Sequence, residues 1–250
     1  PFFWMIMATL KPEAEIGQLA LFPSEITLQS YAKVFEKIPI IRAFGNSLLV
    51  ATCVVACVLL FGSMMGYALS RLQFRGRDAL FNLILFTMVL PFQLTMIPLY
   101  LVIVKLGWID TYMAIIVPYM ISNFAIILFR QFFKSIPQDL IDAARIDGCS
   151  ELGILFRIFW PLSVPTLITV GIITFMGIWN EVLWPLLVVR DQEMMVMPQL
   201  VTLFALGGAA ESQLGVQLAA ATLLALPLLL AYLFFQRYFI ESMATTGLKE

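Results

Sequence analysis

Long runs of residues without a single charge constrain the fold of this chain more than any other feature. The longest, Ala43 to Ser70, is followed by four others of about the same character. About 20 largely apolar residues are needed for a helix to cross the hydrocarbon core of a bilayer. Hydrophobic residues make up 61% of the chain and charged residues only 12%. We therefore expect an all-α, polytopic membrane protein.

The uncharged runs predict five complete transmembrane helices and the truncated end of a first one. The chain starts with Pro1 and its first apolar run is too short to cross a bilayer, so we expect further residues upstream. Met194 to Ala210 is also uncharged but short, and it is predicted to be a structured loop or re-entrant piece, with a further span as the alternative. The predicted elements are the end of a first span at 1–10, an external segment at 11–42, and complete spans at 43–70, 79–104, 111–129, 158–180 continued past Glu181 to 189, and 212–236.

Lysine and arginine residues predict the orientation of these helices. They are concentrated in alternate connections, and the positive-inside rule places those connections in the cytoplasm. The cytoplasmic group is Arg71, Arg75, Arg77, Arg130, Lys134, Arg145, Arg157, Arg237 and Lys249, whereas the short opposite connections carry only Lys105 and Arg190. The external segment 11–42 holds four more, but it is long and mixed with glutamates, so it counts for less. The segment around Asp142 is then cytoplasmic, and the loop 190–211 is external.

Several classes of site are excluded or disfavoured by composition. Histidine is absent, which excludes histidine metal sites, Ser-His-Asp triads and imidazole proton relays. The net charge is -1 without a basic block, so no nucleic-acid partner is expected. The three cysteines are expected to be reduced packing residues. Within the spans, Gly62 and Gly66 favour close helix packing, and the prolines at 91, 98 and 118 predict kinked helices.

The stretch DAARIDGCSELGILFRIFWP, from Asp142 to Pro161, is a polar island between apolar segments. Pro137 suits the first turn of a helix, Gly148 can supply the left-handed residue that ends it, and Ser150 can cap a second helix. The stretch therefore predicts a helix, a glycine turn and a helix. Leu140, Ile141 and Ala144 form an apolar stripe that either a partner protein or the lipid headgroups must cover.

The island resembles the EAA loop of ABC importer permeases, in which Glu-Ala-Ala is followed by three residues, Gly, nine residues and Ile-x-Leu-Pro. Asp142, Ala143, Ala144, Gly148, Ile158 and Pro161 match this spacing, with Asp142 in place of Glu and Trp160 in place of Leu. The resemblance continues in FWMIMATLKP, RLQFRGRD, IPLY, GWIDTY, FRQFFKSIP, WNEVLWPL and QRYFIE, which are similar to MalG-type carbohydrate permeases related to the maltose importer.

This resemblance implies the type I ABC importer transmembrane fold and a division of labour between subunits. The chain would be a non-catalytic permease core at 43–240 in a bacterial or archaeal inner membrane, with a cytoplasmic tail at 241–250. Its partners would be a second, MalF-like permease subunit, a pair of ATPase subunits that hold ATP and magnesium, and an external solute-binding protein that delivers a sugar. This chain has no phosphate-loop motif and is expected to hold no cofactor. A permease for glycerol phosphate or a polyol is the alternative, and a secondary transporter or channel is a weaker one.

The resemblance also assigns candidate sites. In the family the EAA loop, here 134–160, is the coupling helix that sits in a cleft of the ATPase. The coupling candidates are Asp142, Ala143, Ala144, Asp147, Gly148, Ile158 and Pro161. The external loop would reach the binding protein through Gly207 and Gly208, for which a flexible linker is an equal alternative.

Glu181 is an acidic residue within an otherwise apolar span, so it is a candidate for the substrate pathway or a gate. It is predicted to lie toward the outer end of that span, with Trp179 and Trp184 as interface aromatics, which leaves structural anchoring as the alternative. The other polar candidates for the pathway are Gln93, Thr95, Asn123 and Asn180.

Overall fold

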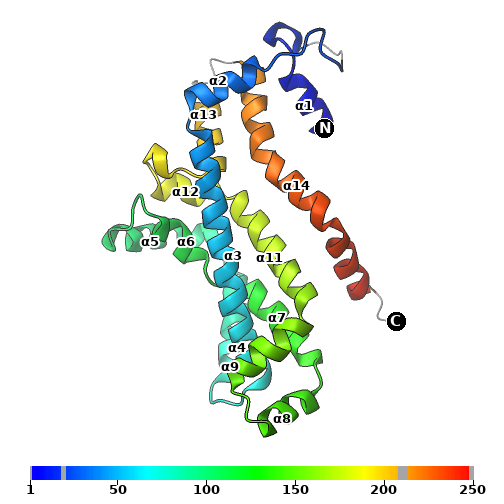
Figure 1. Cartoon of the computed structure of the whole chain (residues 1–250). Helices are drawn as coiled ribbons and strands as arrows, with labels where there is room; N and C mark the ends of the chain where they lie inside the picture. Colours follow the sequence, from blue (N-terminus) through cyan, green and yellow to red (C-terminus); the bar gives the residue numbers. More distant parts are fainter. Residues whose placement is uncertain (1, 18–20, 208–212, 248–250) are drawn as a thin grey trace.

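The computed structural model describes residues 2–17, 21–207 and 213–247, and these residues form helices and loops without a β-strand (Figure 1). The prediction of an all-α chain is confirmed for this part of the sequence. The α-helices are α1 (Phe2–Thr9), α2 (Gln29–Lys37), α3 (Ile40–Arg71), α4 (Arg77–Met88), α5 (Phe92–Lys105), α6 (Tyr112–Ile116), α7 (Asn123–Ser135), α8 (Gln138–Ile146), α9 (Glu151–Ile154), α10 (Trp160–Leu162), α11 (Val164–Trp179), α12 (Leu183–Val188), α13 (Met197–Leu206) and α14 (Leu214–Gly247). Short helical turns lie at η1 (Glu13–Glu15), η2 (Val117–Tyr119), η3 (Leu155–Phe159, a π-helix) and η4 (Gln192–Met194).

Helix α3 is the axis of the fold, with α11 beside it and α7 packed along its lower half (Figure 1). The contact with α7 depends on Gly62 and Gly66, which lie one helical turn apart. A Cβ atom on Gly62 would lie 3.2 Å from Cβ of Ala125, and one on Gly66 would lie 2.6 Å from Cβ of Phe129. The predicted role of this glycine pair in close helix packing is therefore confirmed.

Several of the apolar runs are bent or interrupted instead of forming straight spans. Among the described residues, α3 and the stretch Tyr112–Ser135 are each long and apolar enough to cross a membrane. The pair α4 and α5 bends by 102°, and the segment Glu151–Leu162 meets α11 at 86°. Counting each bent pair as one span gives up to four in this part of the chain, so the predicted five are not confirmed.

Proline explains two of the interruptions in the helices. Pro91 lies between α4 and α5, and Pro118 lies in η2, the turn that separates α6 from α7. A proline lacks the N–H that would continue the hydrogen-bond ladder, and its ring clashes with the preceding turn. The predicted kink at Pro91 is confirmed, Pro118 interrupts its helix with a short turn, and α5 continues through Pro98.

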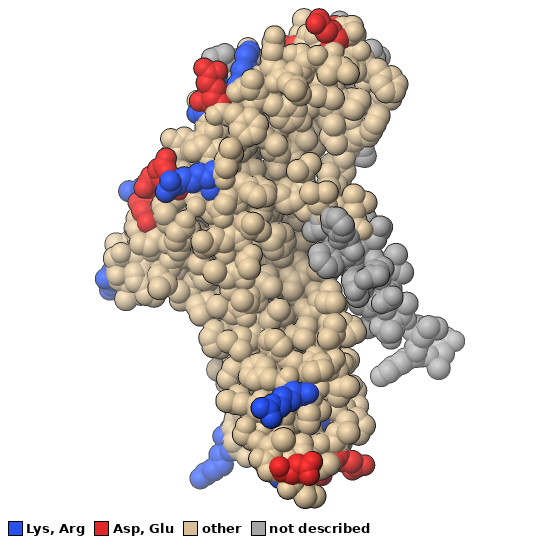
Figure 2. Space-filling view, viewed as in Figure 1, with Lys and Arg blue, Asp and Glu red and all other residues tan. Residues whose placement is uncertain are grey.

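Charged side chains gather at three levels of the molecule. On the face shown in Figure 2, they lie at the α2 end, near α5 and at the α8 end, and the surface between α5 and the α8 end is uncharged. This distribution fits a bilayer around the half of α3 that leads to the α8 end, because the hydrocarbon core excludes unpaired charges.

The segment after α12 is tied to the rest of the fold. The Asp110 carboxylate accepts hydrogen bonds from the backbone N–H groups of Asp191 (2.9 Å) and Arg190, which lower its pKa. Arg42 forms an ion pair with Glu193 at 2.8 Å. Residues 194–210, predicted to be a structured loop or re-entrant piece, contain the largely buried helix α13, which packs against α3 and α14.

The burial of Trp179 and Trp184 contradicts one sequence prediction. Both were expected to be interface aromatics, but only 1% of Trp179 and 0% of Trp184 is exposed. Their indole N–H groups donate to the carbonyls of Leu224 (3.1 Å) and Ala114 (2.8 Å), respectively. Buried indoles need such partners, so these side chains hold α11 and α12 against neighbouring helices.

Candidate functional site

Helices α8 and α9 form the predicted helix, turn and helix at one end of the bundle (Figure 1). Gly148 has φ +79°, the left-handed conformation that favours glycine. Its N–H donates to the carbonyl of Arg145 at 3.0 Å, and that of Cys149 donates to Ala144 at 2.9 Å. These two bonds form a Schellman motif, which closes the end of α8 and sets the direction of the chain after it.

The second helix begins as the sequence predicts. The Ser150 hydroxyl accepts a hydrogen bond from the N–H of Gly153 at 3.2 Å and so caps α9. Pro137 precedes α8 by one residue and stands in its N-cap position. The turn is therefore fixed on both sides, because the Schellman motif ends α8 before it and the Ser150 cap begins α9 after it.

The chain itself covers most of the apolar stripe of α8. Ile141 is 0% exposed and Ala144 is 6% exposed, and both belong to the buried core that also contains Phe133 and Phe159. The expectation that a partner or the headgroups must cover this stripe is thus wrong for these two residues. Leu140 and Ile146, at 45% and 86%, remain exposed on α8.

A chain of polar contacts links α8 and α9 to the end of α3. At one end, Arg71 donates to Oε1 of Gln138 at 2.9 Å, and Nε2 of Gln138 donates to Oδ1 of Asp142 at 3.0 Å. We call the set the α3–α8 polar ring, because it starts and finishes on α3. Its members are Tyr67, Arg71, Gln138, Asp142, Arg145 and Glu151.

The other half of the polar ring closes through Arg145. Its guanidinium lies 3.7 Å from Oδ1 of Asp142 and donates to Oε1 of Glu151 at 2.8 Å. The Tyr67 hydroxyl donates to the second oxygen of Glu151. The hydrogen bond to Glu151 raises the pKa of Arg145.

Arg71 also anchors the connection between α7 and α8. Its guanidinium donates to the carbonyl oxygens of Phe133 and Ile136, with Nε of Arg71 lying 3.1 Å from O of Phe133. These carbonyls lie at the end of α7, where helical partners are missing. A single side chain of α3 thus holds the segment that leads into α8.

The predicted coupling residues fall into different environments. Asp142 belongs to the polar ring, whereas Ala143 and Asp147 are exposed on the outside of α8 and its cap. Gly148 is exposed, and a Cβ atom there would meet no atom of this chain within 4 Å. Ile158 is half-buried in η3, and Pro161 is exposed in α10.

Among the candidates for the substrate pathway, Glu181 lines a cavity. That cavity has a volume of about 440 Å³ and lies against Val54 and Val58, near the middle of α3. Glu181 follows the end of α11 that lies away from α8 (Figure 1), and its predicted place toward the outer end of the span stays a prediction.

The remaining pathway candidates are not among the residues that line this cavity. Gln93 and Thr95 are exposed on α5, where Thr95 donates to the carbonyl of Phe92 at 2.8 Å. The side-chain amide of Asn123 donates to Thr87 at 3.0 Å. That of Asn180 donates to the carbonyl of Met176 within its own helix, at 2.8 Å.

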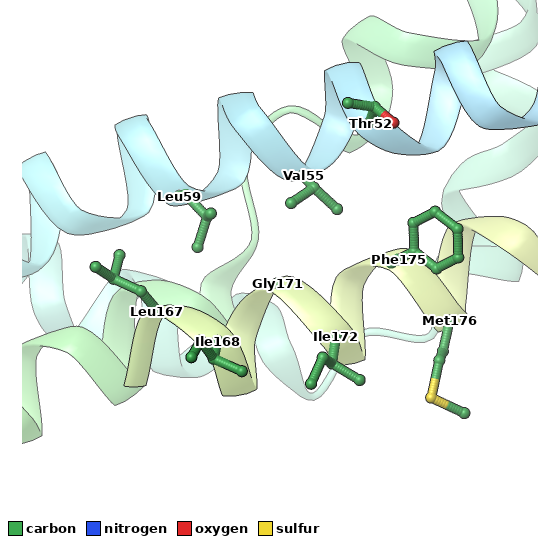
Figure 3. Close-up of a pocket in the computed structure, with 9 residues that line it drawn as sticks. All are labelled: Thr52, Val55, Leu59, Leu167, Ile168, Gly171, Ile172, Phe175 and Met176. Carbon is green, nitrogen blue, oxygen red and sulfur yellow. The ribbon is translucent and has the colours of Figure 1, made fainter. Parts of the chain in front are cut away.

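A second cavity, of about 430 Å³, is an apolar groove between α3 and α11 (Figure 3). Figure 3 shows side chains of both helices facing each other across it. The residues that line it are Thr52, Val55, Leu59, Leu167, Ile168, Gly171, Ile172, Phe175 and Met176. Apart from the Thr52 hydroxyl, these side chains have no hydrogen-bonding oxygen or nitrogen, so this groove suits hydrocarbon and not a polar solute.

The two candidates for contact with a binding protein are only partly described. Gly207 follows α13, and its N–H donates to the carbonyl of Leu203 at 2.8 Å. Its φ is −76°, so it does not use the conformational freedom of glycine. Gly208 lies outside the described residues.

The sequence did not indicate two residues of α3, Tyr67 and Arg71, that the fold brings together with α8 and α9. Tyr67 and Arg71 were read as parts of a span and its flank, but they lie one helical turn apart on α3 and face α8 and α9. Their spacing indicates a shared face of the helix, but the identity of the residues opposite depends on the fold.

Comparisons with known proteins agree with this architecture. Residues 58–245 match the family model described as binding-protein-dependent transport system inner membrane component. The arabinooligosaccharides transport system permease protein AraQ of Halalkalibacterium halodurans is 37% identical over 255 residues, which cover 100% of this chain and 90% of that protein. The lactose transport system permease protein LacG of Rhizobium radiobacter is 31% identical, with 97% of this chain and 88% of that protein covered.

A solved structure extends the agreement to three dimensions. A chain of a bacterial ABC transporter involved in the import of the acidic polysaccharide alginate aligns with a TM-score of 0.83 and 27% identity, covering 96% of this chain and 90% of that one. The resemblance found in the sequence is confirmed by the family match and by this alignment. The chain belongs to the family of inner-membrane permease components of binding-protein-dependent ABC transport systems.

Proposed function

We propose that this chain is a permease subunit of an ATP-driven importer for a sugar or oligosaccharide. It forms half of the translocation pathway, and a second, MalF-like permease subunit forms the other half. An external solute-binding protein delivers the solute, and a pair of ATPase subunits supplies the energy. The relatives named for arabinooligosaccharides and lactose support the choice of solute class.

The observation that carries the proposal is the braced helix–turn–helix at the end of the bundle. Its apolar residues Leu140 and Ile146 are exposed on α8, which leads into a turn that the Schellman motif holds in one conformation. A rigid, partly apolar protrusion is suited to sit in a cleft of a partner protein. We infer that this protrusion, within 134–160, is the coupling loop, with Asp142, Ala143, Ala144, Asp147, Gly148, Ile158 and Pro161 as its key positions.

Orientation and topology complete the proposal. We infer that the α8 end and the tail 241–250 are cytoplasmic and that 11–42 and 190–211 are external, which the concentration of arginine and lysine near α8 supports. The core 43–240 then has the type I importer topology of five complete spans after a truncated first one. Gly207 and Gly208 stay candidates for contact with the binding protein.

Solutes with a phosphate group are disfavoured. Glu181 is the charged residue that lines the cavity near the middle of α3, and its carboxylate would repel a phosphate. Glycerol phosphate is thus a poorer candidate than a neutral sugar or polyol.

Reconstitution tests the proposed function. The chain is incorporated into proteoliposomes together with its partner permease, ATPase and binding protein, and uptake of labelled arabinotriose is measured. We expect uptake that requires ATP, the binding protein and this chain. Arabinotriose uptake by this chain alone, without ATP, would contradict the proposal, as would a complete assembly that takes up no sugar.

The polar ring predicts a specific coupling defect. Tyr67→Phe and Glu151→Ala each remove the hydrogen bond between α3 and α9, and we expect each to lower the sugar transported per ATP about fivefold or more, since about fivefold is the effect of roughly 1 kcal/mol. Because Glu151→Ala also removes the contact with Arg145, the double variant is expected to be no worse than Glu151→Ala alone. Uptake and phosphate release in the same proteoliposomes measure this ratio, and additive losses in the double variant would show that the two residues act separately.

A further inference from the structure

Three interruptions of the helices in the described part of the chain meet at one cavity, the one lined by Glu181. Phe92 comes from the break between α4 and α5, Pro118 and Tyr119 from η2, and Gly177 and Glu181 from the end of α11. Non-helical backbone at membrane depth is tolerated only where protein buries it or where it lines an aqueous cavity. Their convergence on one space indicates a cavity for water or a polar solute.

The cavity has both apolar and hydrogen-bonding walls. Phe92 and Tyr119 lie with their ring centroids 5.4 Å apart, and Trp184 lies 5.9 Å from Phe92 behind them. The hydroxyl-bearing residues Ser122 and Thr174 also line the cavity. An aromatic wall beside hydroxyl and carboxylate groups matches a sugar, which has apolar C–H faces and a rim of hydroxyls.

Two polar groups in the cavity wall have unused hydrogen-bonding capacity. The Tyr119 hydroxyl oxygen is buried and has no hydrogen-bond partner among the described residues. Oε1 of Glu181 accepts the N–H of Trp184 at 3.1 Å, which caps α12, whereas Oε2 accepts no hydrogen bond from the described residues. Leaving a buried hydroxyl unpaired costs stability, so a partner from outside the chain is expected.

We propose that this cavity is a solute-binding site on this subunit for a neutral polyhydroxylated molecule, in which Glu181 and Tyr119 hydrogen-bond to solute hydroxyls. The inference rests on the proposed sugar-import function and deepens it, because this chain then holds the solute directly during passage. The volume of about 440 Å³ accommodates a few sugar rings. The apolar groove of Figure 3 is excluded from this role by its lining.

Two variants separate solute binding from a purely structural role. Glu181→Gln keeps an oxygen that can cap α12 but removes the charge that strengthens bonds to hydroxyl groups. Tyr119→Phe removes a hydroxyl that has no partner among the described residues. If the role is only structural, Tyr119→Phe leaves stability unchanged or improves it, and no solute effect follows.

The experiment measures equilibrium binding of labelled arabinotriose to the complex of both permeases and the ATPase in nanodiscs, without the binding protein. We expect Glu181→Gln to weaken binding about tenfold and Tyr119→Phe about threefold, consistent with lost hydrogen bonds to solute. Thermal unfolding of Tyr119→Phe should be unchanged or shifted upward. Glu193→Gln is the matched control, because Glu193 pairs with Arg42 outside the cavity, and it should bind normally.

The outcomes separate this inference from the function on which it rests. If the complete importer transports arabinotriose but the complex binds none without the binding protein, or if both cavity variants bind like the unaltered complex, the inference is overturned and the function stands. If the complete importer transports no sugar or oligosaccharide, both are overturned.

Discussion

Gly148→Val is expected to reduce sugar uptake by more than about tenfold while ATP hydrolysis continues in the assembled transporter. Gly148 has φ +79°, a conformation in which a β-branched residue is a strong outlier. Valine would break the hydrogen bonds of the Schellman motif and change the direction of the chain between α8 and α9. The ATPase would then no longer bind a turn that moves together with α3, so hydrolysis would be uncoupled from transport.

Gly148→Asn is the control for this result, because asparagine adopts positive φ more readily than other non-glycine residues. A Cβ atom at this position meets no atom of the chain within 4 Å, so the asparagine side chain has room within the permease. We expect this variant to keep most of the uptake per ATP in proteoliposomes. Unchanged transport and hydrolysis in the valine variant would contradict the prediction, and equal losses in both variants would show that an ATPase contact, not backbone conformation, requires glycine.

Gly66→Ala is expected to destabilise the permease by about 1–3 kcal/mol or more, as overpacking does. The added Cβ would lie 2.6 Å from Cβ of Phe129 and 3.0 Å from the backbone nitrogen of Arg130. Neither atom is the end of a flexible side chain, so α3 and α7 would have to separate. The thermal midpoint of the purified chain in detergent, and its folded yield from membranes, measure the effect.

Two other glycines of α3 provide a graded control series. Gly45→Ala adds a Cβ that meets nothing within 4 Å, and we expect no loss because alanine favours helices over glycine. Gly62→Ala places its Cβ 3.2 Å from Cβ of Ala125 and should have an intermediate effect. Equal effects at all three positions would mean that close approach to α7 does not determine stability.

Features that depend on neighbouring residues in the chain were predicted well. Gly148 ends α8 and Ser150 caps α9, because the conformations of a helix stop and start are local properties. Pro91 and Pro118 interrupt helices for the same kind of reason. The roles of Asp142 and Gly148 in coupling stay predictions.

Features that depend on residues distant in the sequence were predicted poorly. The sequence shows that Ile141 and Ala144 share a face of α8, but it does not show that this face belongs to the buried core that also contains Phe133 and Phe159. Trp184 was assigned to the membrane interface because tryptophan is frequent there, whereas a carbonyl of α6 binds its N–H in the interior.

The sequence by itself determined that this chain is a helical membrane protein with a polar helix–turn–helix, since hydropathy, helix caps and proline act over a few residues. Only the tertiary structure decided that Tyr67 and Arg71 hold α8 through the polar ring, and that Phe92, Tyr119 and Glu181 line one cavity. In a chain that is apolar around most of each helix, no polar face specifies the rotation of one helix against another. That rotation follows from side-chain packing, such as the close contact of Gly62 and Gly66 with α7, and it determines which distant residues meet.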